Sequence, residues 1–205
     1  MAMQKDGGTA PTPHKGVQMD TLTTKKFSSK EEAERLFLNA EKRMLDINRW
    51  NDINGAKENQ YQLTDPRGNP KSGFAQEQDY IRFKLPLAPS SNVGKGEDWV
   101  RIEKIVSKIH KDKRSVAMIV RPAANPTTVF TTPAHFYSTD TTNTFMVQWQ
   151  GKEVTAGVFG RNEEPNIEEP NSLYSKLRNF LIGTLAWLGI AKTQWATLIK
   201  GWLKE

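Results

Sequence analysis

The segment NTFMVQWQGKEVTAGVFG (143–160) constrains the fold more than any other part of the sequence. Apolar and polar residues alternate on both sides of Gly151-Lys152, as they do in strands with one buried face. A two-residue connection that starts with glycine fits a type II′ turn between antiparallel strands. This turn sets a register with three apolar cross-strand pairs on one face: Trp149 with Val154, Val147 with Ala156, and Phe145 with Val158.

The same period of two begins near residue 59 and continues to this hairpin. Turn-forming residues divide the region into short runs. The runs before the last hairpin are NQYQL (59–63), DYIRFKLPL (79–87), WVRIEKIVSKI (99–109) and SVAMIVR (115–121). The last two are expected to form a hairpin whose tip is the basic cluster KIHKDKR (108–114). The sequence therefore predicts an antiparallel sheet of about six strands.

A helix is predicted to precede the sheet. Ser29 and Glu32 have the spacing of a capping box, in which each side chain bonds to the backbone N–H of the other residue. We expect the helix to continue to about Asn48, because apolar residues recur at steps of three and four. These residues are Ala33, Leu36, Phe37, Ala40, Met44 and Ile47.

Two helical segments are predicted after the sheet, at 171–190 and 193–203, each with an apolar stripe that would cover the sheet. The element order is typical of an α+β fold: an N-terminal helix, a curved antiparallel sheet of about six strands, and C-terminal helices packed on it. Residues 1–26 are interpreted as a flexible arm and residues 27–205 as one domain. Alternation in VQMDTLTTKKF (17–27) leaves open an additional edge strand in that region.

The element order and the INRWNDI segment (47–53) after the first helix resemble the helix-grip folds of lipid-transfer and pollen-allergen proteins. The resemblance implies a curved sheet that wraps a long C-terminal helix, with a cavity between them. A shared fold does not by itself assign a function.

Composition and motifs exclude several kinds of chemistry. The chain of 205 residues has no cysteine, so disulfides, thiolate nucleophiles and cysteine-ligated metals are excluded. It has no GxSxG, SxxK, HExxH or Walker motif, and we predict neither a cofactor nor a metal site. The acidic run NEEPNIEEP (162–170) is interpreted as a connector. The start of the sequence lacks a signal peptide, and the longest apolar run (180–190) is too short to span a bilayer. We therefore expect a cytoplasmic protein that is not transmembrane.

A non-catalytic binding role is the first functional hypothesis. The apolar face of the sheet and the C-terminal helices would hold an apolar small molecule or a protein partner. The residues expected to contact such a ligand are Phe145, Val147, Trp149, Val158 and Trp187.

An enzyme, of hydrolase or lyase type, is the alternative hypothesis. Extending the hairpin register places Thr142 beside Arg161 and Asp140 beside Glu163. His135 is close in sequence, so His135, Arg161 and Glu163 could form a polar rim at one end of the sheet. In that rim the imidazole would act as a base and the guanidinium would hold an anion.

Association with nucleic acid or anionic lipid is a third, less favoured hypothesis. The net charge of +6 and the pI of about 9.4 permit a polyanionic partner. Tyr80, Arg82 and Lys84 alternate along one run, as in surfaces that stack bases beside cations. The tryptophans and lysines of the C-terminal helices also fit a helix lying in a membrane interface.

Overall fold

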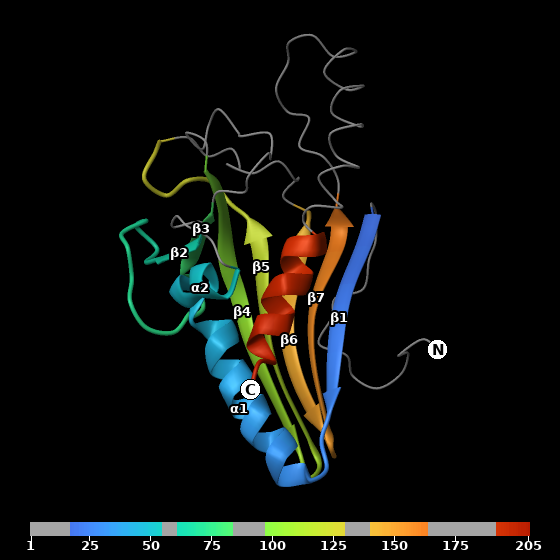
Figure 1. The fold of residues 1–205 in the computed structure, drawn as a ribbon. Helices are drawn as coiled ribbons and strands as arrows, with labels where there is room; N and C mark the ends of the chain where they lie inside the picture. The colour runs from blue at the N-terminus through green and yellow to red at the C-terminus, as the bar shows by residue number, and fades with distance from the viewer. Residues whose placement is uncertain (1–16, 55–60, 84–96, 130–139, 164–191) are drawn as a thin grey trace.

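The computed structural model describes residues 17–54, 61–83, 97–129, 140–163 and 192–205. Seven antiparallel strands in these residues form one sheet with the order β1-β7-β6-β5-β4-β3-β2 (Figure 1). The strands are β1 (Val17–Lys26), β2 (Tyr61–Thr64), β3 (Tyr80–Phe83), β4 (Asp98–His110), β5 (Lys113–Pro122), β6 (Thr142–Gln150) and β7 (Glu153–Glu163).

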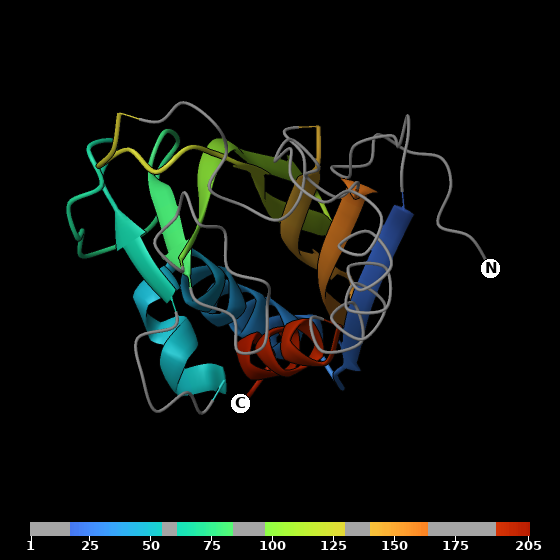
Figure 2. The same ribbon diagram turned by 90° about the horizontal axis from the view of Figure 1, so that it is seen from above.

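The helices lie together on one side of the sheet. They are α1 (Lys30–Leu45), the 3₁₀ turn η1 (Ile47–Arg49), α2 (Trp50–Asn54) and a C-terminal helix at 192–202. Viewed from above, the sheet curves around them, so its concave face meets the helices (Figure 2). The predicted α+β class and helix-grip-like layout are confirmed, with seven strands where about six were expected.

The additional strand is β1, in the region that the sequence analysis gave to the arm while leaving an edge strand open. It pairs with β7 from Met19 opposite Gly160 to Lys26 opposite Glu153. A strand at the edge of a sheet needs fewer apolar residues than a central one, because no neighbouring strand covers its outer side. β-branched threonines are sufficient for such a strand.

The capping box of α1 forms as predicted. Ser29 Oγ accepts a hydrogen bond from the Glu32 backbone N–H at 3.2 Å, and Glu32 Oε2 accepts one from the Ser29 N–H at 3.3 Å. All six predicted apolar residues of this helix are buried. The helix ends at Leu45 instead of about Asn48, because the chain tightens into η1 before Trp50 enters the core.

The C-terminal helix is part of the hydrophobic core. Leu198, Ile199, Trp202 and Leu203 are fully buried against the sheet and α1. Burial of one such side chain stabilises a fold by about 1.5–3 kcal/mol. Arg43 of α1 also donates a hydrogen bond of 2.9 Å to the Trp202 carbonyl, which ties the two helices together. The predicted helix at 171–190 lies outside the described residues.

Candidate functional site between the sheet and the C-terminal helix

The β6–β7 hairpin has the predicted register, with all three apolar pairs as expected. Gly151 has φ of +57°, whereas Lys152 is not among the residues with positive φ. This combination is the predicted type II′ turn. The four strand residues proposed to bind a ligand, Phe145, Val147, Trp149 and Val158, are consequently buried on the concave face. Trp187, the fifth, lies outside the described residues.

Aromatic rings surround Phe145 at the centre of this layer. Its ring centroid is 5.1 Å from that of Trp50, 5.5 Å from Trp195 and 6.2 Å from Trp202. The C-terminal helix crosses the concave face over β6 and β7 and supplies two of these rings (Figure 1). A ligand that contacts Phe145 would therefore lie between the sheet and this helix.

Several buried polar atoms in this layer lack a hydrogen-bond partner. In the described part of the chain these include Thr21 Oγ1, Asn143 Oδ1 and Trp202 Nε1, while Trp99 Nε1 and Thr144 Oγ1 are equally buried and unpaired outside this layer. By contrast, the indole N–H of Trp50 donates to the carbonyls of Arg43 and Met44. Leaving a buried donor or acceptor unpaired costs about 1–3 kcal/mol, so each of these atoms requires an explanation.

The rim proposed for catalysis has a different set of contacts from those expected. Arg161 pairs across β7 and β6 with Thr142, as predicted. Its guanidinium, however, is buried, forms an ion pair with the partly exposed carboxylate of Asp20 and lies 5.6 Å from the ring centre of Phe159. Phe159 alternates with the concave-face residue Val158, so this cluster lies on the convex side of the sheet.

Asp20 is thus a partner of Arg161 that the sequence analysis did not identify, because it belongs to the segment assigned to the arm. The alternation in VQMDTLTTKKF was the available signal, since pairing this segment with β7 brings Asp20 opposite Phe159. His135 lies outside the described residues, and the side chain of Glu163 is not described. Catalysis by this rim remains a prediction.

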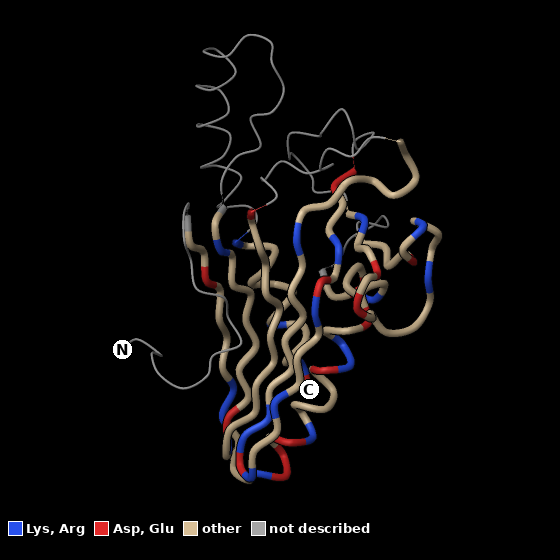
Figure 3. The backbone as a smooth tube through the Cα atoms, turned by 180° about the vertical axis from the view of Figure 1, so that it is seen from behind, with Lys and Arg blue, Asp and Glu red and all other residues tan. Residues whose placement is uncertain are grey.

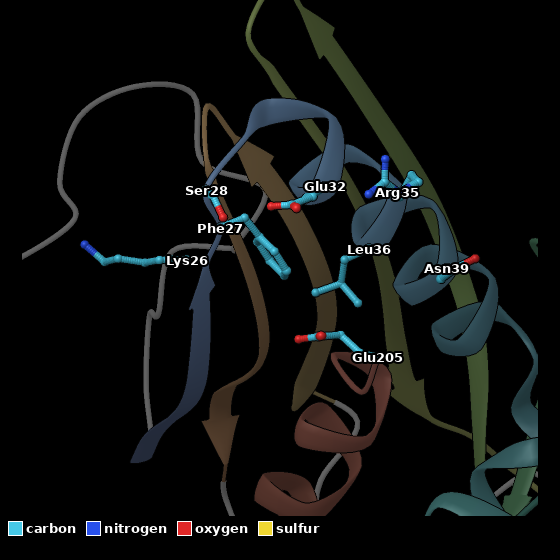
Figure 4. A pocket seen from close by; sticks show the side chains of 8 residues that line it. All are labelled: Lys26, Phe27, Ser28, Glu32, Arg35, Leu36, Asn39 and Glu205. Atoms are coloured by element: carbon cyan, nitrogen blue, oxygen red, sulfur yellow. The ribbon is translucent and has the colours of Figure 1, made fainter.

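A separate open cleft of about 510 Å³ lies where β1 leads into α1 (Figure 4). It is lined by Lys26, Phe27, Ser28, Glu32, Arg35, Leu36, Asn39 and Glu205. Several of its charges already have partners: Glu205 pairs with Lys25 at 3.0 Å, and Glu32 caps α1. Lys26 bonds to Glu153, which raises the pKa of the ammonium above its ordinary value. Among the described residues, these internal pairs leave Arg35 as the lining cation that has no ion pair.

The basic and aromatic row proposed for nucleic acid is also partly engaged within the fold. Tyr80 lies edge-on to Trp99, with 6.5 Å between ring centroids, and Arg82 is 3.5 Å from Glu97. Lys84 lies outside the described residues. The predicted basic cluster is the turn between β4 and β5, where Asp112 pairs with Lys30. In the backbone view from behind, acidic and basic residues lie close together at the end of the sheet that holds the turn between β4 and β5 (Figure 3).

The described residues contain no group of three or more histidine, aspartate or glutamate side chains placed to hold a metal ion. Most of the acidic run 162–170 lies outside them. No described helix has both the length and the hydropathy needed to cross a bilayer.

Comparisons with known proteins leave the family open. No protein-family model matches the chain, and no curated protein matches it. A crystal structure of major latex-like protein 151 from Panax ginseng is similar over 85% of this chain and 97% of that chain, with 14% identity and a TM-score of 0.36. A hypothetical protein of Helicobacter pylori is similar over 97% and 98% of the two chains, with 9% identity and a TM-score of 0.43. Because both TM-scores are below 0.5, the functional proposal must depend on this chain's own residues.

Proposed function

We propose that this protein binds a small, mainly apolar molecule between the concave face of the sheet and the C-terminal helix, without catalysing a reaction. The observation that carries the proposal is the indole N–H of Trp202, a fully buried donor with no partner among the described residues. It lies within an aromatic cluster with Trp50 and Phe145. An acceptor group on a bound molecule would satisfy this donor.

The surroundings of Trp202 support an apolar ligand. Buried indole N–H groups usually have a hydrogen-bond partner, and Trp50 in the same cluster has two. Binding sites for small molecules are mainly apolar and aromatic, with a few polar groups that fix the orientation of the ligand. The layer around Phe145 has this composition.

The structure favours binding over catalysis by the rim because of the contacts that Arg161 makes. Its guanidinium is already neutralised by Asp20 and also donates to the Gly160 carbonyl at 2.7 Å. An anionic substrate would have to compete for this guanidinium with the Asp20 carboxylate, whose side chain is 33% exposed.

Titration with methyl decanoate, whose ester carbonyl can accept from the Trp202 indole N–H, tests the proposal, with displacement of the fluorescent probe 8-anilinonaphthalene-1-sulfonate as the readout. We expect saturable binding by the folded protein. Trp202→Phe should weaken it about fivefold to tenfold, because the substitution removes the donor and keeps an aromatic ring. Trp50→Phe is the matched control: it should lower the melting temperature, because it removes the donor that two backbone carbonyls accept from, and change the affinity less than Trp202→Phe does. The proposal fails if methyl decanoate does not bind, or if Trp202→Phe binds it as tightly as the wild type.

A further inference from the structure

Gly160, near the end of β7, is a glycine on the concave face that lies outside the aromatic cluster. Asn143 on β6 lies opposite Gly160 on β7, and Gly160 lies opposite Met19 on β1. Directly opposed residues share a face, so glycine leaves the position between Asn143 and Met19 without a side chain. Glycine inside a strand often marks a place where a ligand or another backbone approaches closely.

Two unpaired polar atoms flank this position. Asn143 Oδ1 is buried and has no hydrogen-bond partner. Thr21 is 7% exposed, and its Oγ1 is likewise unpaired. Thr21 lies opposite Val158, two residues along β7 from Gly160, so its side chain is on the same concave face. The two atoms therefore border the same glycine from two neighbouring strands.

The chemistry of these atoms limits what can bind. An amide oxygen accepts hydrogen bonds, and a threonine hydroxyl both donates and accepts. The neighbouring positions on this face are Met19, Phe145 and Val158, none of which carries charge. Arg161, the nearby cation along β7, forms its ion pair with Asp20 on the convex side. Among the described residues of this face, an ionised carboxylate would meet an acceptor at Asn143 Oδ1 and no balancing cation.

We propose that Gly160, Asn143 and Thr21 form a subsite for the polar end of the ligand, which is an uncharged group carrying an O–H or N–H, such as an alcohol or a primary amide. The group donates to Asn143 Oδ1 and exchanges a hydrogen bond with the Thr21 hydroxyl. Its apolar chain extends from this end toward Phe145, and a second group further along the ligand accepts from the Trp202 indole N–H. This inference rests on the proposed function, since it specifies the ligand of the same layer.

The test compares 1-decanol, decanamide and decanoate at pH 8 by displacement of the same fluorescent probe from the wild-type protein. The three probes share chain length and differ only in the head group. We expect the alcohol and the amide to bind about tenfold more tightly than the carboxylate, which is the effect of one or two hydrogen bonds together with an avoided buried charge. Thr21→Val and Asn143→Leu, which keep shape and remove polarity, should each reduce this preference to about threefold or less.

Thr24→Val is the control, because Thr24 is a threonine on the same strand as Thr21 but lies on the convex face, where it bonds to Thr155. It should leave the preference unchanged. Thr21→Val should also raise the melting temperature of the free protein, because it removes a buried unpaired hydroxyl. This second readout remains informative if Asn143→Leu does not fold.

The outcomes separate the inference from the proposed function. Binding of all three probes with equal affinity, unaffected by Thr21→Val, would refute the subsite while leaving a ligand-binding layer. Tighter binding of decanoate would refute it in the same way. No binding of any probe would refute the function and, with it, the subsite.

Discussion

Gly201→Ala tests whether the C-terminal helix is packed as described. In an exposed helix this substitution stabilises the fold by up to about 1 kcal/mol, because alanine has the higher helix propensity. Here a Cβ atom on residue 201 would overlap Ile53 Cγ2 and lie 3.3 Å from Ile53 Cβ. Isoleucine is branched at Cβ and stiff at χ1, so this methyl group cannot easily move aside.

The magnitude follows from these opposing effects. Overpacking of a core typically costs about 1–3 kcal/mol, and the rigidity of Ile53 places this contact near the upper end. After subtraction of the gain in helix propensity, we expect Gly201→Ala to lower the free energy of unfolding by about 2 kcal/mol. In the background Ile53→Ala the overlap disappears. The same substitution should then be neutral or stabilising, with a coupling energy of about 2–3 kcal/mol between the two sites.

Urea denaturation followed by circular dichroism measures the four proteins of this double-mutant cycle. Lys200→Ala, on the exposed side of the same helix, is the control and should change stability by less than about 0.5 kcal/mol. If Gly201→Ala stabilises the protein by the same amount with and without Ile53, the C-terminal helix does not pack against α2. The layer in which we place the ligand would then be wrong.

Three further predictions concern other parts of the fold. Asp20→Asn should lower the free energy of unfolding by about 2 kcal/mol in denaturant titrations, since it removes the carboxylate that pairs with the buried guanidinium of Arg161; a change below about 0.5 kcal/mol would contradict the ion pair. Removal of residues 171–205 should abolish the cooperative thermal transition, and a truncated chain that still melts cooperatively would contradict the core packing. Hydrogen bonds donated by Asn69 lower the pKa of Asp65, so this carboxyl stabilises the fold above its unfolded pKa and loses that effect as pH falls through its folded pKa. Its NMR titration midpoint should rise in Asn69→Ala, and an unchanged midpoint would contradict the turn geometry.

Local patterns correctly predicted the last hairpin and the start of the first helix. Gly151 determined the turn, and the period of two then determined which side chains of β6 and β7 share a face. The capping pair Ser29 and Glu32 determined where α1 begins. These features depend on residues close in sequence, which is why a single sequence was sufficient to place them.

The features that were missed depend on contacts between distant residues. The ion pair of Asp20 with Arg161 joins residues 141 positions apart, and it exists only because β1 adds to β7. The unpaired indole N–H of Trp202 depends on the packing of the C-terminal helix against the sheet and α1, which are distant from it in sequence. The predicted register of the last hairpin does place Asn143 opposite Gly160. It could not show that Thr21 lies near this pair, because that depends on the pairing of β1 with β7.

The central claim is that a ligand occupies the layer beneath the C-terminal helix and bonds to the indole N–H of Trp202. Two-dimensional ¹H–¹⁵N NMR of the indole groups during titration with methyl decanoate, whose ester carbonyl is an acceptor, tests it most directly. The claim predicts a saturable downfield shift of the Trp202 indole proton, as expected for a donor that gains an acceptor, with a much smaller shift for Trp50, whose donor is already engaged. An unchanged Trp202 indole resonance at saturating methyl decanoate would contradict it.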